Sequence, residues 1–439
     1  MELFSETASV CPVCLRRVKA AIVKRGGEYF MEKTCPEHGF FSVVVWRGDD
    51  PAPGEWGEVS PPADGSRGAP DCPNMCGLCP EHLQKTCCAL VEVTHRCNLR
   101  CPVCFADSGV RRSRVSVKLS VETLYARFRK LAAAGNTFVQ LSGGEPTMRD
   151  DLPDIVAAAK AAGCEYVQLN SNGIRLGAEP EYASALADAG LDFVFMQFDG
   201  TRDAIYETLR GRPLLEQKLA AIDVCAERYL GVTLVPTVVP GVNDGDIGAI
   251  LEFGFQRSPA VRGVHFQPIS YFGRYPKPPD NADRITLPEI LRAIESQTRG
   301  KVKVSDLLPS ACDHPRCGFH GDFVVLPDKL LKLTKKSKAS SSCCDDAHLR
   351  NRRFVARRWK RTRGTADAAG GGTDAAVDYG GMDGFLERVK SHGFTITCMA
   401  FQDAYNLDLE RLRRCSLHVF DGRRTVPFCA RYITPRQQP

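Results

Sequence analysis

The chain has 439 residues, 43% of them hydrophobic and 25% charged, which is the composition of an ordinary globular protein with a sizeable core. The net charge of +6 is too mild to indicate a nucleic-acid partner, and no apolar run is long enough to span a membrane. The 20 cysteines, many in C-x2-C or C-x3-C spacing and with no export signal before them, favour metal ligands over disulfides and predict a cytoplasmic protein.

Residues 1–60 are predicted to form a small module held together by one metal ion. Cys11 and Cys14 precede a hairpin-like stretch, and Cys35 and His38 follow it. This spacing is typical of a structural zinc site or of a rubredoxin-like iron site. The four ligands do not decide between zinc and iron.

Residues 61–90 carry a second group of cysteines. Cys72, Cys76 and Cys79 have C-x3-C-x2-C spacing, and Cys87 and Cys88 follow closely. A fourth thiolate from that pair, which we assign to Cys88, would complete the four-cysteine ligand set of an auxiliary [4Fe–4S] cluster.

Residues 91–305 alternate short apolar runs with helical stretches. This alternation predicts an α/β fold with parallel strands and right-handed crossovers. The predicted strands are 89–94, 137–141, 166–170, 193–198, 232–238 and 264–268, and the predicted helices lie within 123–134, 152–163, 183–190 and 210–228.

The loop after the first predicted strand contains Cys97, Cys101 and Cys104. Three thiolates can hold three irons of a [4Fe–4S] cluster and leave the fourth iron open, whereas an electron carrier normally has four cysteine ligands. The triad in 61–90 has the same spacing but does not follow a strand. We therefore assign the reactive cluster to the loop after the first strand.

Polar residues follow the later predicted strands. Folds with parallel strands gather their ligands at the carboxyl ends of those strands, so these residues are expected to surround one site. They are Ser142, Gly143, Gly144, Glu145, Asn170, Asn172, Gln197, Asp199, Thr237 and Gln267.

Together these motifs resemble the radical S-adenosylmethionine (SAM) superfamily. Segment 97–104 is similar to its C-x3-C-x2-C signature, and segment 143–146 is similar to its GGEP motif. The resemblance implies a partial (β/α)6 TIM-like barrel, SAM bound to the open iron, formation of a 5′-deoxyadenosyl radical, and a GGEP carboxylate that binds the SAM amino group. The residue before the third cysteine is usually aromatic in this superfamily but is Val103 here, and we expect Phe105 to substitute.

Residues 306–439 are predicted to hold a second auxiliary cluster. Its proposed ligands are Cys398, Cys415 and Cys429, together with Cys312 or Cys317. Cys343 and Cys344 are a weaker alternative. Two further cysteines lie within apolar stretches and are expected to pack in the core, namely Cys164 and Cys225.

A basic and glycine-rich insertion spans 329–381. Its Lys and Arg side chains, with Trp359 as an interfacial anchor, predict peripheral contact with anionic lipid headgroups at the inner face of a membrane. An equally good interpretation is a solvated basic loop.

The whole layout resembles the tetraether lipid synthase family, members of which have also been described as dihydropterin methyltransferases. That resemblance implies coupling of unactivated alkyl chain ends of membrane lipids. Two alternatives stay open: a radical SAM methyltransferase or peptide-modifying enzyme with auxiliary clusters, and a non-enzymatic iron–sulfur electron carrier. The expected partners are a reductant such as ferredoxin or flavodoxin, a lipid or other small-molecule substrate, and no nucleic acid.

Overall fold

The structure is a computed structural model that describes residues 2–57, 82–109, 119–310, 313–334, 359–361 and 381–435. Several residues with predicted roles lie outside the described residues: Cys72, Cys76, Cys79, Cys312, Cys343, Cys344 and most of the insertion 329–381.

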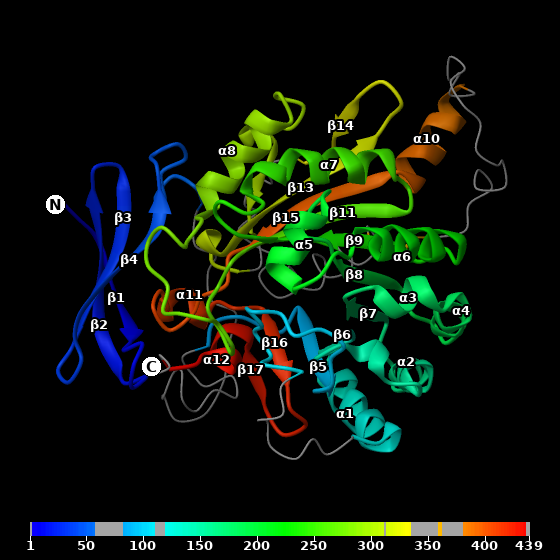
Figure 1. Cartoon of the computed structure of the whole chain (residues 1–439), viewed down its shortest axis with the longest axis horizontal. Helices are drawn as coiled ribbons and strands as arrows, with labels where there is room; N and C mark the ends of the chain where they lie inside the picture. The colour runs from blue at the N-terminus through cyan, green and yellow to red at the C-terminus, as the bar shows by residue number, and fades with distance from the viewer. Residues whose placement is uncertain are drawn as a thin grey trace.

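The amino-terminal module is a four-stranded antiparallel sheet in which sequence neighbours pair (Figure 1). Gly26 and Gly27 form the turn between its second and third strands, both with positive φ, as a two-residue hairpin turn requires. The strands are β1 (Glu2–Val10), β2 (Arg17–Arg25), β3 (Glu28–Cys35) and β4 (Gly39–Arg47).

The large sheet of the molecule contains six parallel strands that follow one another in space as they do in sequence. This arrangement confirms the predicted α/β fold and its partial barrel. The six strands are β5 (Cys88–Thr94), β6 (Phe138–Gly143), β7 (Tyr166–Ser171), β8 (Phe193–Gln197), β9 (Gly231–Val235) and β11 (Val261–Pro268), and the short β10 (Thr237–Val238) pairs with β11.

Helices cover the outer face of this sheet (Figure 1). The helix predicted within 210–228 is α6 (Leu215–Glu227). The helix before it, α5 (Asp203–Arg210), was not predicted; it ends at Gly211, which has a φ of +84° and is followed by Pro213. The α-helices of this part are α1 (Val121–Ala133), α2 (Leu152–Ala161), α3 (Ile174–Ala178), α4 (Pro180–Asp188), α5 (Asp203–Arg210), α6 (Leu215–Glu227), α7 (Ile247–Gln256) and α8 (Leu287–Gln297), with 3-10 turns at Pro146–Met148, Asp244–Asp246, Val304–Asp306 and Pro315–Cys317.

Successive side chains of each barrel strand face opposite sides, one toward the helices and the other toward the barrel interior. Val167 and Leu169 of β7 are fully buried in the apolar layer under the helices. Gln168 and Asn170 of the same strand point the other way, into the barrel. The barrel interior is therefore polar where the helix-facing layer is apolar.

Strands from the region after residue 305 continue the same sheet at both edges. In Figure 1, β15 runs beside and parallel to β11, and β16 lies parallel to β5 at the opposite edge. The added elements are β12 (Leu308–Pro309), β13 (Gly318–Val325), β14 (Leu330–Lys332), β15 (Gly393–Met399), β16 (Leu417–Phe420), β17 (Thr425–Pro427), α10 (Gly381–Ser391), α11 (Leu409–Arg413) and α12 (Phe428–Tyr432).

Trp359 closes the barrel at the amino-terminal ends of its strands, which corrects the prediction of an interfacial anchor. Its ring is 7% exposed, packs against Phe193 and Phe195, and donates from Nε1 to Thr395 Oγ1 at 2.8 Å. A side chain held in this aromatic floor cannot insert into a lipid surface. Lys360 next to it pairs with the buried Asp192 at 2.7 Å.

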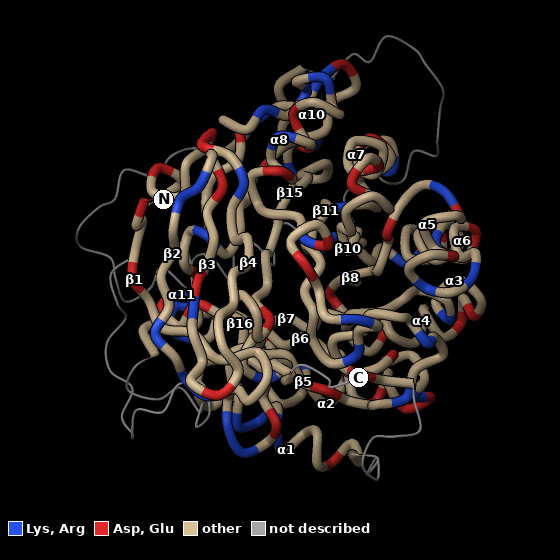
Figure 2. Tube along the Cα trace, turned by 60° about the vertical axis from the view of Figure 1, so that its left-hand side comes forward, with Lys and Arg blue, Asp and Glu red and all other residues tan. Residues whose placement is uncertain are grey.

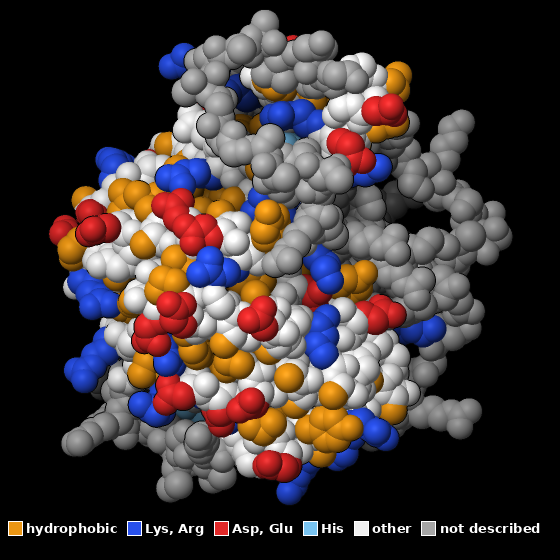
Figure 3. All heavy atoms as spheres, turned by 90° about the vertical axis from the view of Figure 1, so that its right-hand side faces the viewer, with side chains coloured by type: hydrophobic (Ala, Val, Ile, Leu, Met, Phe, Trp, Pro, Cys, Tyr) orange, Lys and Arg blue, Asp and Glu red, His pale blue; other side chains and the backbone are white. Residues whose placement is uncertain are grey.

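The described part of the surface that Figures 2 and 3 show carries charges of both signs. Acidic, basic and apolar side chains are interspersed on the face in Figure 3, and both charge signs are distributed along the trace in Figure 2. No helix among the described residues is both long and apolar enough to cross a bilayer.

Candidate active site

The three cysteines of the reactive loop follow β5 at the carboxyl end of the barrel. Cys101 is buried, while Cys97 and Cys104 are partly exposed. Burial raises the pKa of the Cys97 thiol to about 11, so a positively charged iron would be needed to hold it as a thiolate at neutral pH. One loop thus presents three thiols at the mouth of the barrel.

Arg274, which sequence reasoning missed, clamps this loop. Its Nε and Nη2 both donate to the Cys101 carbonyl at 3.1 Å, and its backbone exchanges hydrogen bonds of 2.9 and 3.0 Å with Cys104. The preceding Gly273 has a φ of +54°, and a Cβ there would lie 2.6 Å from the Cys104 carbonyl oxygen. Only glycine allows this close approach.

The Ser142–Glu145 turn docks directly onto the start of the cysteine loop. Gly144 N donates to the Thr94 carbonyl and Glu145 N to the Arg96 carbonyl, each at 2.8 Å. A Cβ on Gly143 would lie 2.0 Å from the Thr94 oxygen, so the contact needs glycine. The two predicted motifs therefore form one backbone-paired unit.

The Glu145 carboxylate is 2% exposed and already accepts four hydrogen bonds from the chain. Thr147 donates from N and Oγ1 at 3.0 and 2.7 Å, Ser171 Oγ donates at 2.8 Å, and Asn172 N donates at 2.6 Å. The carboxylate thus fixes the turn against the end of β7. A contact with a SAM amino group would be made in addition to these four bonds.

A buried ion pair lies beside Cys101. Arg210 donates to the two carboxylate oxygens of Asp199 at 2.7 and 2.5 Å, and both side chains are less than 9% exposed. Burial alone would lower the pKa of Arg210, but Asp199 and a hydrogen bond to Cys101 outweigh burial and raise it. Arg210 therefore keeps a positive charge against a cluster-binding sulfur.

Lys218 is a second buried cation that sequence reasoning missed. Its Nζ donates to the Asn172 carbonyl, and burial, partly offset by Asp199, lowers its pKa to about 8. Asn172 in turn donates to Asn98 of the cysteine loop at 2.7 Å. A signal was present in the sequence, since Lys218 heads a stripe of α6 that is otherwise apolar.

The remaining predicted residues also lie at the carboxyl ends of the strands. Thr237 and Gln267 are register partners in adjacent strands. Asn170 and Gln197 are partly exposed inside the barrel. Phe105 packs instead on α12, with ring centroids 5.6 Å from Phe428 and 4.9 Å from Tyr432.

The amino-terminal module brings together the four residues predicted to bind one metal ion. The ligand atoms of Cys11, Cys14, Cys35 and His38 all lie within 4.8 Å of one another. Burial opposes ionisation of Cys35, but hydrogen bonds from His38 and from nearby backbone N–H groups lower its pKa to about 6. A closed set of three sulfurs and one nitrogen fits a single tetrahedral metal ion.

Known protein families match both the barrel and the amino-terminal module of this chain. Residues 91–254 match the family described as the radical SAM superfamily, and residues 3–47 match the HMPTM N-terminal zinc ribbon domain. The 7,8-dihydro-6-hydroxymethylpterin dimethyltransferase of Methanocaldococcus jannaschii is 30% identical across 99% of this chain and 94% of its own. The chain belongs to the radical SAM superfamily.

More distant similarities cover only part of this radical SAM enzyme. The GTP 3′,8-cyclase of Corynebacterium glutamicum is 30% identical over 54% of this chain and 60% of its own. Among solved structures, Streptococcus suis SuiB bound to S-adenosylmethionine is 14% identical, covers 49% of this chain and 48% of its own, and has a TM-score of 0.40.

A further group of cysteines lines a second pocket of the radical SAM enzyme. Cys317 comes from one segment and Cys415 and Cys429 from a second, distant one, and together they surround this pocket with Arg411 and Asp313. Arg411 Nε lies 3.5 Å from Cys317 Sγ, and burial raises the pKa of all three thiols. Cys312 lies outside the described residues but next to Asp313 in the chain.

Cys398 does not join this group, in contrast to our prediction. It lies on β15 and packs in the apolar layer under the helices. Its neighbour Met399 lines the cysteine pocket instead. Because successive side chains of a strand point to opposite faces, a shift of one position separates a pocket residue from a core residue.

The other cysteines are distributed as follows. Cys164 and Cys225 are buried in the apolar core, as predicted. Cys88 begins β5 and lies in the aromatic floor with Phe138, Phe193 and Trp359.

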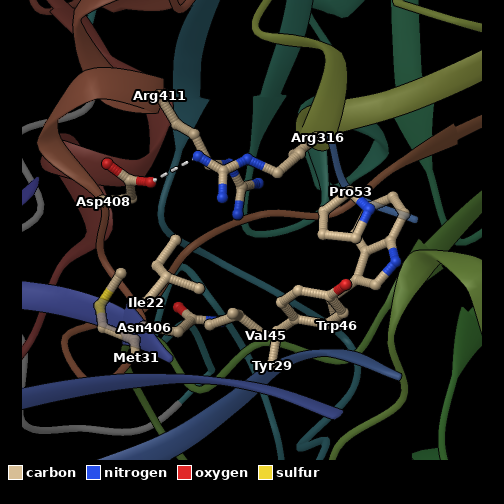
Figure 4. Close-up of a pocket in the computed structure, with 10 residues that line it drawn as sticks. All are labelled: Ile22, Tyr29, Met31, Val45, Trp46, Pro53, Arg316, Asn406, Asp408 and Arg411. Atoms are coloured by element: carbon tan, nitrogen blue, oxygen red, sulfur yellow. Dashed lines mark hydrogen bonds and ion pairs between the residues drawn. The ribbon is translucent and has the colours of Figure 1, made fainter. Parts of the chain in front are cut away.

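The zinc ribbon packs directly behind the cysteine pocket. Figure 4 shows Arg316 and Arg411 together beside Asp408, across from Ile22 and other apolar side chains of the ribbon. Arg411 lines both this pocket and the cysteine pocket. Thr7 of β1 also donates to Asp408 at 2.7 Å, and Figure 2 shows α11 beside the ribbon.

Proposed function

We propose that this radical SAM enzyme methylates a pterin-like heterocycle. The observation that carries the proposal is the 30% identity to a dihydropterin dimethyltransferase along nearly the whole of both chains, zinc ribbon included. Methyl transfer was an alternative in the sequence analysis. The comparisons support it better than the coupling of lipid chain ends.

The residues at the barrel mouth fit a three-cysteine cluster with SAM. Three thiols lie on one loop, the guanidinium of Arg210 offsets negative charge at Cys101, and the glycine turn leaves backbone groups close to the loop. When bound, the cluster and SAM supply a 5′-deoxyadenosyl radical. The family needs a reductant for this, and we propose a ferredoxin- or flavodoxin-type protein.

The chain's own contribution is positioning and electrostatics. Arg274 and Asn172 hold the cysteine loop, and Glu145 holds the glycine turn. Lys218 and Arg210 place two cations beneath the loop in a site removed from water, where they can offset carboxylate or thiolate charge. These interactions would keep SAM and cluster in one geometry for hydrogen abstraction.

The barrel interior supports a small polar substrate more than an alkyl chain. Its strands carry Gln140, Gln168 and His265 at alternating positions, and its floor is closed by Phe193 and Trp359. A lipid chain gains nothing from amide and imidazole groups and needs a long apolar channel. A compact heterocycle can use those groups.

We also propose an auxiliary [4Fe–4S] cluster at the cysteine pocket. Cys317, Cys415 and Cys429 supply three thiolates, Cys312 is the proposed fourth, and Arg411 offsets their charge. A second auxiliary cluster is proposed on Cys72, Cys76 and Cys79, with its fourth thiolate from the pair Cys87 and Cys88; Cys87 is partly exposed, whereas Cys88 packs in the aromatic floor. Together with the reactive cluster this predicts about twelve cluster irons, and one more if the ribbon holds iron rather than zinc.

The deciding experiment is an anaerobic assay with SAM, a reductant and 7,8-dihydro-6-hydroxymethylpterin. Methylation is expected to give a pterin whose mass rises by one methylene unit per methyl group, with a methyl-labelled SAM or folate revealing the carbon's source. A parallel assay with a membrane lipid tests the other hypothesis. Coupled lipid chains together with an unmodified pterin would refute the proposal.

A further inference from the structure

The barrel interior is unusually polar. Strand register places Gln140 beside Gln168, Phe195 beside Thr233, and His265 beside Thr397. Along the sheet, Gln168 is the register partner of Phe193 in the aromatic floor, and Asn170 is the partner of Phe195. Gln168 is therefore deeper in the barrel than the cysteine loop and the glycine turn.

Two polar atoms of the barrel interior are buried without a partner among the described residues. Gln168 Oε1 and Thr233 Oγ1 accept and donate no hydrogen bond, although both residues are fully buried. Each such atom destabilises the folded chain relative to one that has a hydrogen-bond partner. A leucine and a valine would fill these positions without that cost, so folding does not explain the polar residues.

The neighbouring groups form a connected but incomplete network. Gln168 Nε2 donates to Asn170 Oδ1 at 2.6 Å, and Asn170 Nδ2 lies 3.5 Å from Gln140 Oε1. His265 Nδ1 lies 2.8 Å from Thr397 Oγ1. Burial lowers the pKa of His265 to about 4, so its imidazole is neutral and can accept as well as donate.

The shape and chemistry of this interior suit a flat, neutral heterocycle. An amide side chain presents a donor and an acceptor side by side, which matches the alternating edge of a fused pyrimidine ring. The rings of Phe195 and His265, with centroids 5.5 Å apart, offer apolar faces next to that edge. An alkyl chain would leave the amides unsatisfied.

We infer that Gln140, Gln168 and His265 recognise the hydrogen-bonding edge of the substrate heterocycle below SAM. The inference rests on the proposed methylation of a pterin-like ring and names the residues that select it. Thr233 would contribute its hydroxyl from the adjacent strand. The ring would lie between the radical source at the barrel mouth and the aromatic floor.

The test uses Gln168→Leu and Gln140→Leu in the reconstituted full chain, with Gln217→Leu as a matched control. Gln217 is an exposed residue of α6, so the same chemical change is made away from the barrel interior. Binding of 6-hydroxymethylpterin in the presence of SAM is followed by the fluorescence of the pterin, and SAM binding and thermal unfolding are measured in parallel. Each interior variant is expected to weaken pterin binding about tenfold or more, and SAM binding much less.

The outcomes separate the two claims. If the unmodified enzyme and both interior variants bind the pterin equally, the inference is overturned while the proposed function stands. If the unmodified enzyme neither binds nor methylates the pterin, the proposed function fails and takes this inference with it. Thr233→Val, which keeps the side-chain shape, provides a fold-preserving check, and its unchanged pterin affinity would remove the Thr233 contact from the site.

Discussion

The zinc ribbon and the carboxyl-terminal cysteine pocket are two metal-type sites assembled in opposite ways. The ribbon takes four ligands from two short loops of one small sheet, Cys11–Cys14 and Cys35–His38. The pocket combines Cys317 with Cys415 and Cys429, which lie almost a hundred residues or more further along the chain. Spacing along the chain predicted all four residues that the structure brings together in the first site, whereas one ligand predicted for the second, Cys398, does not line the pocket.

The difference follows from how each site is built. Residues in one short loop cannot move far apart, so their spacing already limits the geometry. Residues from distant segments meet only after the sheet has formed, and a candidate on a strand, such as Cys398 on β15, can face either side of that sheet. The reactive cysteine loop resembles the ribbon in this respect, and its assignment from spacing needed no later correction.

The largest expected effect concerns that local loop. Cys101→Ala should reduce 5′-deoxyadenosine formation to background, because one iron of the reactive cluster loses its thiolate. Iron content should fall by about one cluster's four irons, leaving the other centres loaded. Anaerobic product analysis and iron counting check this. A variant that makes 5′-deoxyadenosine at the unmodified rate would show that the reactive cluster lies elsewhere.

The next largest effect concerns the cysteine pocket, and it tests whether a site formed by distant segments has the ligands that the structure indicates. Cys415→Ser should also remove about four irons, whereas Cys398→Ser should remove none, because Cys398 faces the apolar layer. Iron counting and electron paramagnetic resonance of the reduced protein distinguish the two variants. Equal loss of iron in both would restore Cys398 as a ligand and contradict the strand-parity argument.

A smaller effect is expected from the ribbon. Cys35→Ser should lose the single ribbon metal and lower the unfolding temperature, since the metal closes a module with a small core of its own. Glu37→Gln, which breaks only an exposed ion pair with Arg16, is the matched control and should retain the metal. Metal analysis and calorimetry provide the measurement. Full metal retention in Cys35→Ser would exclude that sulfur from the site.

The smallest effect is a dependence of stability on pH next to the assembled pocket. His82 and His418 are in contact at 3.1 Å, and burial lowers the pKa of His82 to about 4 and that of His418 well below its usual 6.5. Below pH 6.5, the two histidines therefore bind protons in the unfolded chain but stay neutral in the folded chain. The free energy of unfolding should fall as pH drops from 6.5 to 4, by at most about 1.4 kcal/mol per pH unit for each histidine.

Anaerobic urea titrations of the unmodified protein and of His82→Gln measure that slope. The variant should show a shallower fall over the same interval, because it lacks one of the groups that resist protonation. Identical slopes in the two proteins would mean that His82 does not contribute. Stability that rises on acidification would contradict the predicted sign.

Sequence reasoning predicted most of the fold correctly. Short apolar runs alternating with helical stretches identified all six parallel strands, because the hydrophobic periods of strands and helices can be recognised within short stretches of sequence. The differences were local too: some helices, α5 among them, were not predicted, and β11 begins three residues earlier than predicted. Element ends are less well determined because capping and pairing decide them.

By itself, the sequence determined the three-cysteine loop, the glycine turn and the ribbon ligands, because each is a short segment whose spacing constrains its own geometry. Tertiary structure alone decided that Arg210 and Lys218 lie beneath Cys101, that Trp359 closes the barrel floor, and that Cys317 rather than Cys398 faces the pocket. The first set depends on contacts between near neighbours in the chain. The second depends on which face of a strand or helix meets a distant partner, and that is fixed only when the sheet is assembled.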